Sequence, residues 1–298
     1  MINNIILLSL AAAIWGFGFI AARWTLVSFD SFWATALRFL LAGVLSLPFL
    51  IYKRSFTRKN NILMKSAISS VFLLGTLLFQ TLGLSYTTVA KSGFITTLYS
   101  LLIPLLTMIF AKKRYRSSFW MLIVLALVGM AFMCNLEISD LNRGDFLTLL
   151  CAFSAAFHIM YIGKVAAHID SPIEFNFLQN VFVALFSLLL ALFFKGQVSL
   201  SPLLNFESPT VIGLLYLDII SSMISFSIQV VAQKKIPSHI AGLIFLMESP
   251  FAAVFGYFVL KESLNPMNIA GALLVMLSVI LVPVLGREVT TPKKPSES

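Results

Sequence analysis

The sequence alternates between long apolar runs and short polar segments over most of its length. Each run approaches the roughly 20 mainly apolar residues that a helix needs to cross the hydrocarbon core of a bilayer. The pattern therefore predicts an all-α integral membrane protein with ten transmembrane helices. The expected spans are residues 4–23, 31–52, 63–85, 91–111, 118–135, 144–163, 175–194, 210–232, 239–259 and 266–286.

The overall composition agrees with a membrane protein. Hydrophobic residues make up 59% of the 298 residues and charged residues only 11%, and the mean hydropathy is +0.96. A water-soluble protein could not keep so much apolar surface away from solvent. Residues 287–298 form a polar tail that we do not expect to fold alone. The two cysteines, Cys134 and Cys151, are too few for a structural zinc site or a disulfide framework.

The basic residues predict how the chain is oriented. With the N-terminus in the cytoplasm, fifteen Lys and Arg residues fall in inner loops or the tail, and five fall on the outer side. Such an excess marks the cytoplasmic loops. The net charge of +9 therefore comes mainly from basic residues in the loops and the tail. It does not indicate a nucleic-acid binder, in which basic residues would gather on a soluble face.

The second half of the sequence repeats the first. Segments that start at Gln80 and at Gln229 each pass through a short polar loop and continue as an apolar helix containing a proline, Pro104 or Pro250. Because each half has five spans, the two copies must cross the membrane in opposite directions. We predict inverted five-helix repeats at residues 4–135 and 144–286, with both termini cytoplasmic. This build is usual in secondary transporters, and a non-transporting sensor or scaffold of the same build is the alternative.

Polar side chains fall on single faces of three predicted spans. They are Ser69, Thr76 and Gln80 beside Leu73 in the third span, Ser154, His158 and Tyr161 in the sixth, and Asp218, Ser222, Ser225 and Gln229 in the eighth. Lipid offers these groups no hydrogen-bond partner, so they should line a cavity or bond neighbouring helices. Helix bonding is the favoured role for the serines and threonines. Both roles stay open for the two glutamines and Asp218, and His158 is either structural or a contact for substrate or a proton.

No motif in the sequence indicates an enzyme. A serine and a histidine one turn apart, Ser154 and His158, could suggest a hydrolase, but the G-x-S-x-G elbow is absent. The phosphate loop, the HExxH motif and the dinucleotide fingerprint are absent as well. We therefore predict a protein without enzymatic activity, cofactor or metal.

Charged residues in or near the spans need an explanation, because each costs about 2.5–3.5 kcal/mol at the bilayer centre on insertion scales. Arg23, Arg38 and Asp218 are predicted structural or gating charges, with Arg38 in a structural ion pair. Glu248 lies two residues before Pro250, which cannot donate to the Leu246 carbonyl. We expect a free carbonyl there, another where Pro104 breaks the first copy, and Glu248 in a substrate or proton site. A buried structural ion pair is the alternative for Glu248.

The sequence resembles the EamA-type family of the drug/metabolite transporter superfamily. In the first copy the resemblance rests on "AAIWGFGFIAARWTL", "ALRFLLAG" and "GLSYTTVAKSGFITTLY". In the second it rests on "GDFLTLLCAFSAAFHIMYIGKVA" and "AQKKIPSHIAGLIFLMESPFAAVFGYFVLKESLNPMNIAGALL". The first copy departs from the family at "AKKRYR", where many members carry an acidic turn similar to "LKESL".

The resemblance implies a ten-helix transporter of the cytoplasmic (inner) membrane of a bacterium. It implies export of amino acids or other small metabolites without ATP. The aromatic rings, amides and carboxylate among the candidate residues named below suit a small zwitterion or an organic cation, and Glu248 makes protons the candidate coupling ion. It places a cavity between the third, fourth, eighth and ninth helices, closed by the first and sixth. The substrate-binding candidates are Trp15, Gln80, Tyr99, His158, Tyr161, Gln229 and Glu248. A passive channel of the same fold is a further alternative.

Overall fold

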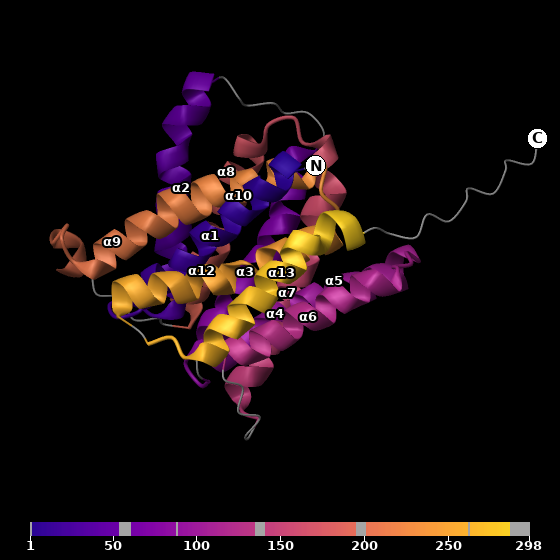
Figure 1. The fold of residues 1–298 in the computed structure, drawn as a ribbon. Coiled ribbons are helices and arrows are strands. Elements are labelled where there is room, and N and C mark those ends of the chain that lie inside the picture. The colour runs from indigo at the N-terminus through magenta and orange to yellow at the C-terminus, as the bar shows by residue number, and fades with distance from the viewer. Residues whose placement is uncertain are drawn as a thin grey trace, which may run out of the picture.

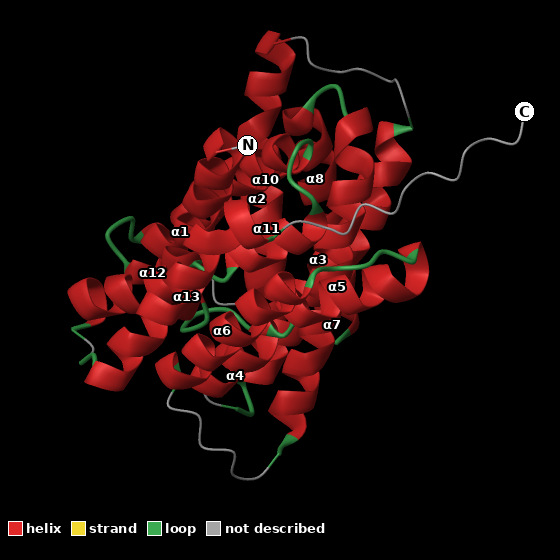
Figure 2. Ribbon diagram, turned by 45° about the vertical axis from the view of Figure 1, so that its right-hand side comes forward, coloured by secondary structure: helices red, strands yellow, loops and turns green. Residues whose placement is uncertain are grey.

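The computed structural model describes residues 2–53, 61–87, 89–134, 141–194, 201–261 and 263–286. Within these ranges the chain consists of helices joined by short loops, with no strand (Figure 2). The first half contains α1 (Ile2–Thr25), α2 (Ser31–Lys53), α3 (Ile62–Leu84), α4 (Val89–Thr97), α5 (Tyr99–Ala111) and α6 (Ser117–Met133). The second contains α7 (Arg143–Val165), η1 (Ala166–His168), α8 (Pro172–Phe193), η2 (Ser201–Leu204), α9 (Pro209–Leu215), η3 (Tyr216–Ser225), α10 (Phe226–Gln233), α11 (Ser238–Phe245), α12 (Glu248–Phe255), η4 (Gly256–Leu260) and α13 (Pro266–Leu285).

Nine helical stretches in the described part of the chain are long and apolar enough to cross a membrane. They confirm the helical membrane fold and coincide with nine of the ten predicted spans. Four of the spans are composite. Ser92–Ala111 is broken once, Arg143–His168 ends in the 3-10 helix η1, and Pro209–Gln233 and Ser238–Leu260 contain the π-helical segments η3 and η4. The predicted span 118–135 corresponds to α6, which is apolar but has only 17 residues. The tail at 287–298 lies outside the described residues.

Capping residues in the sequence determine where four helices of the second half begin. The side chains of Asn142, Ser171, Ser208 and Asn265 each accept a backbone N–H of the first turn of the helix that follows. These N–H groups have no partner inside the helix, so a side-chain acceptor stabilises the start. In the last three cases a proline follows the cap, where its missing N–H costs nothing.

The two halves of the chain interlock. Helix α2 packs along α8, α3 along α7, and α6 along α13, while α1 packs against α12, α9 and η3. Each of these pairs joins one helix of the first half to one of the second (Figure 1). The start of α1 and the end of α13 lie on the same side of the bundle in that view. Any site at the centre is therefore built from both halves.

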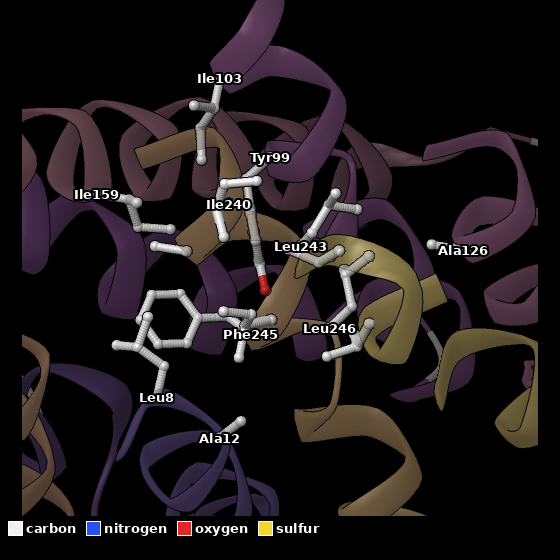
Figure 3. Packing of buried hydrophobic residues seen from close by; sticks show 14 of the residues in the cluster. Leu8, Ala12, Tyr99, Ile103, Ala126, Ile159, Ile240, Leu243, Phe245 and Leu246 are labelled. Carbon is white, nitrogen blue, oxygen red and sulfur yellow. The ribbon is translucent and has the colours of Figure 1, made fainter. Parts of the chain in front are cut away.

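The distribution of side chains is that of a bundle surrounded by lipid. Large apolar residues such as Leu10, Val44 and Ile280 are exposed, whereas Asn180 and Gln229 are buried. The largest buried apolar cluster joins α1, α5, α6, α7, α10, α11 and α13. Figure 3 shows part of this cluster, in which Tyr99 reaches past Ile240 toward Phe245. Apolar outer faces and polar inner faces are what lipid-exposed helices require.

Candidate functional site

Two spans are interrupted at matching places in the centre of the bundle. Span four breaks at Leu98, between α4 and α5, and span nine breaks at Leu246 and Met247, between α11 and α12. At both breaks a backbone hydrogen bond spans three residues instead of the four of an α-helix. Leu98 N donates to Ile95 O at 3.1 Å, and Met247 N donates to Ile244 O at 3.0 Å. Such tight turns inside a helix often occur at functional positions.

The breaks follow the repeat and not the prolines. When Gln80 is placed over Gln229, Leu98 falls on Met247, whereas Pro104 and Pro250 differ by three positions. Pro104 lies inside α5, and Pro250 lies in the first turn of α12. The predicted free carbonyl at Leu246 is wrong, because this oxygen accepts the Ser249 N–H at 3.3 Å. A proline in a first turn removes no helical bond, and the three-residue turn before it relieves the clash of its ring with the preceding turn.

A cavity of about 130 Å³ lies beside the two breaks. Its walls come from α1, α2, α3, both parts of spans four and nine, α7, η3 and α10. Six of the seven predicted substrate contacts line it: Trp15, Gln80, Tyr99, His158, Gln229 and Glu248. Tyr161 does not; its ring lies 6.1 Å from that of Phe72, on another part of α7. The structure thus brings together residues from segments far apart in the sequence.

Residues at equivalent positions of the two halves line the cavity in pairs. Four pairs share the spacing of Gln80 and Gln229, namely Leu77 and Phe226, Gln80 and Gln229, Thr96 and Phe245, and Tyr99 and Glu248. The members of the last pair begin α5 and α12, directly after the breaks. Each break therefore turns the first side chain of a half-helix toward the same space.

Helix α1 closes the cavity through the segment Trp15–Gly18. A β-carbon on Gly16 would lie 2.7 Å from the Glu248 carbonyl oxygen and 2.9 Å from Ala252 N, so only glycine permits this contact with α12. The indole of Trp15 packs against the rings of Phe226 and Phe245, with ring centroids 5.1 and 5.0 Å away. The glycine thus positions an aromatic wall directly beside Glu248.

Two buried polar atoms in the cavity wall have no hydrogen-bond partner within the described part of the chain. They are the donor Nε1 of Trp15 and the acceptor Oε1 of Gln229. The Gln229 amide is held in place because its Nε2 donates to Gln233 Oε1 at 2.9 Å. Buried polar groups without partners are costly and rare in folded proteins. A donor and an acceptor left open in one cavity therefore suit a polar ligand.

The charged groups divide between the cavity and its surroundings. Arg38 and Glu248 line the cavity, Asp218 is fully buried behind it, and Arg23 is exposed in the last turn of α1. Arg38 donates from Nε to Ser222 Oγ at 2.7 Å and from Nη2 to Ser221 Oγ at 2.8 Å. Its guanidinium lies within electrostatic range of both Asp218 and Glu248. In place of the predicted ion pair, the hydrogen bonds of Arg38 go to hydroxyl groups.

His158 belongs to a hydrogen-bonded chain that begins at the cavity wall. Its Nε2 lies 3.3 Å from Gln179 Oε1, which also accepts the Ser69 hydroxyl at 2.6 Å. Because this amide oxygen only accepts, Nε2 carries the hydrogen in this arrangement. Both predicted roles meet in this residue: His158 lines the cavity and ties α7 to α8.

The cavity is displaced toward one end of the bundle. It extends from Trp15 and Gln229 toward Ala22, Gln80 and Leu217, which lie near the end of α1, near the end of α3 and early in span eight. On the opposite side, Gln233 Nε2 and Ser238 Oγ both donate to the Ile159 carbonyl, at 3.0 and 3.3 Å. Leu8 and Ile240 fill that side with apolar packing.

Comparison with known families decides the class of the protein. A model of the EamA-like transporter family matches residues 3–135 and, separately, residues 142–283. The protein belongs to the EamA-like transporter family. The predicted resemblance is confirmed, and the chain is a multi-pass membrane transporter, which points away from an enzyme.

Relatives of this EamA-like protein agree with the assignment. An uncharacterized transporter of the archaeon Archaeoglobus fulgidus is 30% identical over 275 residues, covering 92% of this chain and 84% of the relative. A crystal structure of another protein aligns with a TM-score of 0.76 and 16% identity, covering 95% of this chain and 96% of that one. The second likeness shows the fold alone. Because the relative is archaeal, the bacterial inner-membrane location stays a prediction.

Several lining residues of this EamA-like chain were missed by reasoning from the sequence. Phe226 and Phe245 are plain apolar residues in apolar runs, and Ser221 lies beside the polar face that was chosen. The repeat spacing held the missing signal for the two rings, because they pair with Leu77 and Thr96. Arg38 was assigned to an ion pair because the sequence cannot show that two hydroxyl groups would meet it.

Proposed function

We propose that this protein is a secondary transporter that exports amino acids, other small polar metabolites or organic cations across the cytoplasmic membrane by alternating access. The observation that carries the proposal is the cavity in which Trp15 Nε1 and Gln229 Oε1 lack partners beside the Glu248 carboxyl group. A solute with a hydrogen-bond acceptor, a donor and a positive group would satisfy all three.

The nature of the walls supports this class of solute. Aromatic rings of Trp15, Tyr99 and Phe226 surround the space, and such rings bind cations through their faces. Glu248 would meet an ammonium group, while the unpaired N–H of Trp15 supplies a donor for a carboxylate. A zwitterion with a small apolar side chain combines all of these features.

Several observations support a two-repeat mechanism. The family model matches the two halves separately, the paired lining positions share one spacing, and both breaks have the same local geometry. Inverted repeats allow one half to rock against the other around a site at their interface. With the N-terminus in the cytoplasm, the cavity is displaced toward the outer side, and the contacts of Ile159 close the inner side. This arrangement fits a state that releases solute outward.

Counterflow in proteoliposomes tests the proposal. The purified full-length chain would be reconstituted with L-phenylalanine, L-leucine, L-alanine or tetramethylammonium inside, and uptake of the same radiolabelled solute would be followed. A carrier is expected to accelerate labelled uptake when unlabelled solute is on the far side. Liposomes without protein give the background.

Each other outcome of this assay contradicts the transporter proposal in a different way. Uptake that ignores solute on the far side would indicate a passive channel. Binding of a solute, measured as a rise in melting temperature, without any uptake would indicate a sensor or scaffold. The orientation is tested separately: Arg114→Cys should be labelled only from the cytoplasm and Leu141→Cys only from outside. Labelling of both from one side would refute the proposed inversion.

A further inference from the structure

Asp218 is a carboxylic acid that the proposed solute site does not use. It lies in η3, its exposure is 0%, and neither Oδ1 nor Oδ2 has a hydrogen-bond partner within the described part of the chain. A carboxylate in such a place would pay the full cost of lost hydration. The neutral acid loses much less hydration free energy, so the surroundings of Asp218 favour its protonated form.

The nearest cation does not neutralise this acid in the present conformation. Arg38 lies within electrostatic range of Asp218, yet its hydrogen bonds go to Ser221 and Ser222, three and four residues further along η3. In the π-helical η3, Ser222 lies nearly one turn from Asp218, so the guanidinium that it binds is close to the acid. A change of side-chain rotamer would therefore take the guanidinium from the two hydroxyl groups to the carboxylate.

A second side chain without partners lies at the same depth. Asn180 in α8 is fully buried, and neither its Nδ2 nor its Oδ1 has a partner among the described residues. The contacts Lys234 Nζ to Ile169 O and Asn176 Nδ2 to Ser222 O show that α8 runs antiparallel to span eight. One turn beyond Asn176, Asn180 therefore lies level with Asp218. The amide offers a donor and an acceptor at the depth where the acid lacks both.

Other titratable groups around η3 are few and distant. The elements packed on it are α1, α2, α8, α9 and α10, and the last two contain no titratable residue. Helix α1 contributes Arg23, which lies more than a turn further along than Gly18, the residue beside Ser221. Helix α8 contributes Glu174 in its first turn, α2 contributes Tyr52 and Lys53 at its far end, and Tyr216 in η3 donates its hydroxyl to Ile14 O at 2.8 Å. Arg38 is thus the charge that faces Asp218, and Glu248 faces the same guanidinium from α12.

We propose that Asp218 carries the proton that is exchanged for solute, with Arg38 as the group that replaces this proton when it leaves. In the present conformation the acid is protonated and Arg38 is held by Ser221 and Ser222. When the O–H bond of the acid breaks, the proton leaves to water, and the carboxylate draws the guanidinium away from the two serines. The step moves one proton and forms one ion pair, so charge and atoms balance.

This inference rests on the proposed function, because it supplies the coupling that export against a gradient requires. Arg38 also lines the cavity and lies in electrostatic range of Glu248. Its movement toward Asp218 would remove a positive charge from the wall that Glu248 shares, and the site would then hold a cationic group more tightly. Proton loss and solute binding are thereby linked through one side chain.

A proton fits this place better than a metal cation. A sodium ion needs several oxygen ligands at once, whereas the two serine hydroxyls nearest Asp218 already accept hydrogen bonds from Arg38. The guanidinium would also repel a second cation at close range. The experiment therefore also compares sodium with potassium, which distinguishes a proton site from a sodium site.

Infrared difference spectroscopy of the purified full-length protein tests the proton directly and requires no solute. A protonated carboxylic acid has a carbonyl stretching band that disappears as the pH is raised. We expect such a band in the wild type, its loss in Asp218→Asn, and its retention in Glu248→Gln. In Ser221→Ala/Ser222→Ala the band should disappear at a lower pH than in the wild type, because the released guanidinium then pairs with Asp218 and stabilises its carboxylate. Labelling the wild type with [4-13C]aspartate should shift the band, which keeps the test valid even where a variant fails to fold.

A band that survives in Asp218→Asn, or that the aspartate label leaves in place, would overturn the proposal. Replacement of sodium by potassium should change nothing, and a sodium-dependent loss of the band would likewise overturn it. In proteoliposomes, Asp218→Asn should keep counterflow but lose accumulation driven by an imposed pH gradient. Asp145→Asn, in which the capping acid of α7 is replaced, is the control that should keep both. If wild type moves no solute, the proposed function fails while the infrared result still decides the proton site.

Discussion

The pair α6 and α13 and the group α1, η3 and α12 are both contacts between the two halves of the chain, but they are built differently. Helices α6 and α13 are joined at both ends, where Ser118 Oγ donates to Leu285 O at 3.0 Å and Asn268 Nδ2 donates to Met133 O at 2.8 Å. Between these bonds the backbones touch at Gly129 and Gly271. Around α1 and η3, by contrast, helices are broken or widened, and polar atoms of Trp15, Asp218 and Gln229 lack partners.

This difference separates a fixed frame from a part that can change shape. Backbone contact through glycines leaves no room for sliding, and satisfied end bonds oppose separation of the two helices. Unpaired polar atoms and three-residue turns leave hydrogen bonds unmade, and another conformation or a ligand can form them. We therefore expect motion around α1, η3 and α12 to proceed against a stationary α6–α13 pair. The predictions below test this contrast, beginning with the largest effect.

Gly271→Val should destabilise the frame most strongly. A β-carbon there would meet the Gly129 carbonyl oxygen and lie 2.6 Å from Met133 N, and backbone cannot move aside cheaply. We expect a loss of about 3 kcal/mol or more in the free energy of unfolding, measured by melting in detergent. Gly93→Ala in α4 is the matched control, since nothing lies within 4 Å of its β-carbon. Equal melting of both variants would disprove the tight contact.

Glu248→Gln should impair the site without harming the frame. The amide keeps the shape of the side chain but removes the charge that would meet a cationic group. We expect the affinity for a zwitterionic or cationic solute to fall about tenfold, with an unchanged melting temperature. Binding would be measured by calorimetry, with the exposed Glu207→Gln as control. A drop in melting temperature at full affinity would instead assign Glu248 to structure.

Gln229→Ala and Gln233→Ala should separate binding from packing within one helix. Gln229 offers the cavity an open acceptor, so its loss should weaken solute affinity by about 1 kcal/mol. Gln233 donates to Ile159 O and also holds the Gln229 amide, so its loss should lower the free energy of unfolding by about 1 kcal/mol and weaken solute affinity less than Gln229→Ala does. The reverse pattern in paired melting and binding measurements would exchange the two roles.

Tyr161→Phe should have the smallest effect. The side chain lies outside the cavity and packs near Phe72, which the phenyl ring can still do. Solute affinity and transport rate should stay within about twofold of the wild type, as for substitutions away from any special contact. A larger loss of transport in the counterflow assay would restore Tyr161 to the binding site.

The pattern of apolar runs predicted most of the fold because each span must carry its own hydrophobic length. It could not predict where spans four and nine break. The prolines attracted attention, yet α5 accommodates Pro104 in its interior and the breaks occur at Leu98 and Leu246–Met247. Tight turns here depend on which carbonyls neighbouring groups satisfy, such as Thr97 Oγ1 donating to Phe94 O at 2.6 Å. Such partners are decided by packing and leave no periodic signal.

The candidate site was predicted in large part because polar residues inside a membrane protein are few and need partners. From the sequence, Arg38 was expected to pair with an acidic residue, because a charge inside a membrane protein was taken to need a counter-charge. The structure supplies Ser222, which was expected to bond neighbouring helices, and Ser221, which the sequence did not single out. Likewise, Tyr99 and Tyr161 are both tyrosines within apolar spans, and the sequence does not distinguish them. Only Tyr99 follows a break, at Leu98, and only Tyr99 lines the cavity.

The paired lining positions are equivalent in the repeat but differ in chemistry: Tyr99 corresponds to Glu248, and Thr96 corresponds to Phe245. If the two halves were identical, a two-fold rotation in the membrane plane would relate the inward-open and outward-open forms of the proposed inverted repeat, and their free energies would be equal. Each unlike pair lowers the free energy of one form relative to the other. An empty carrier of this kind rests mainly on one side of the membrane, and its half-cycles run at unequal rates. Divergence after duplication would thus give a symmetric frame a preferred direction.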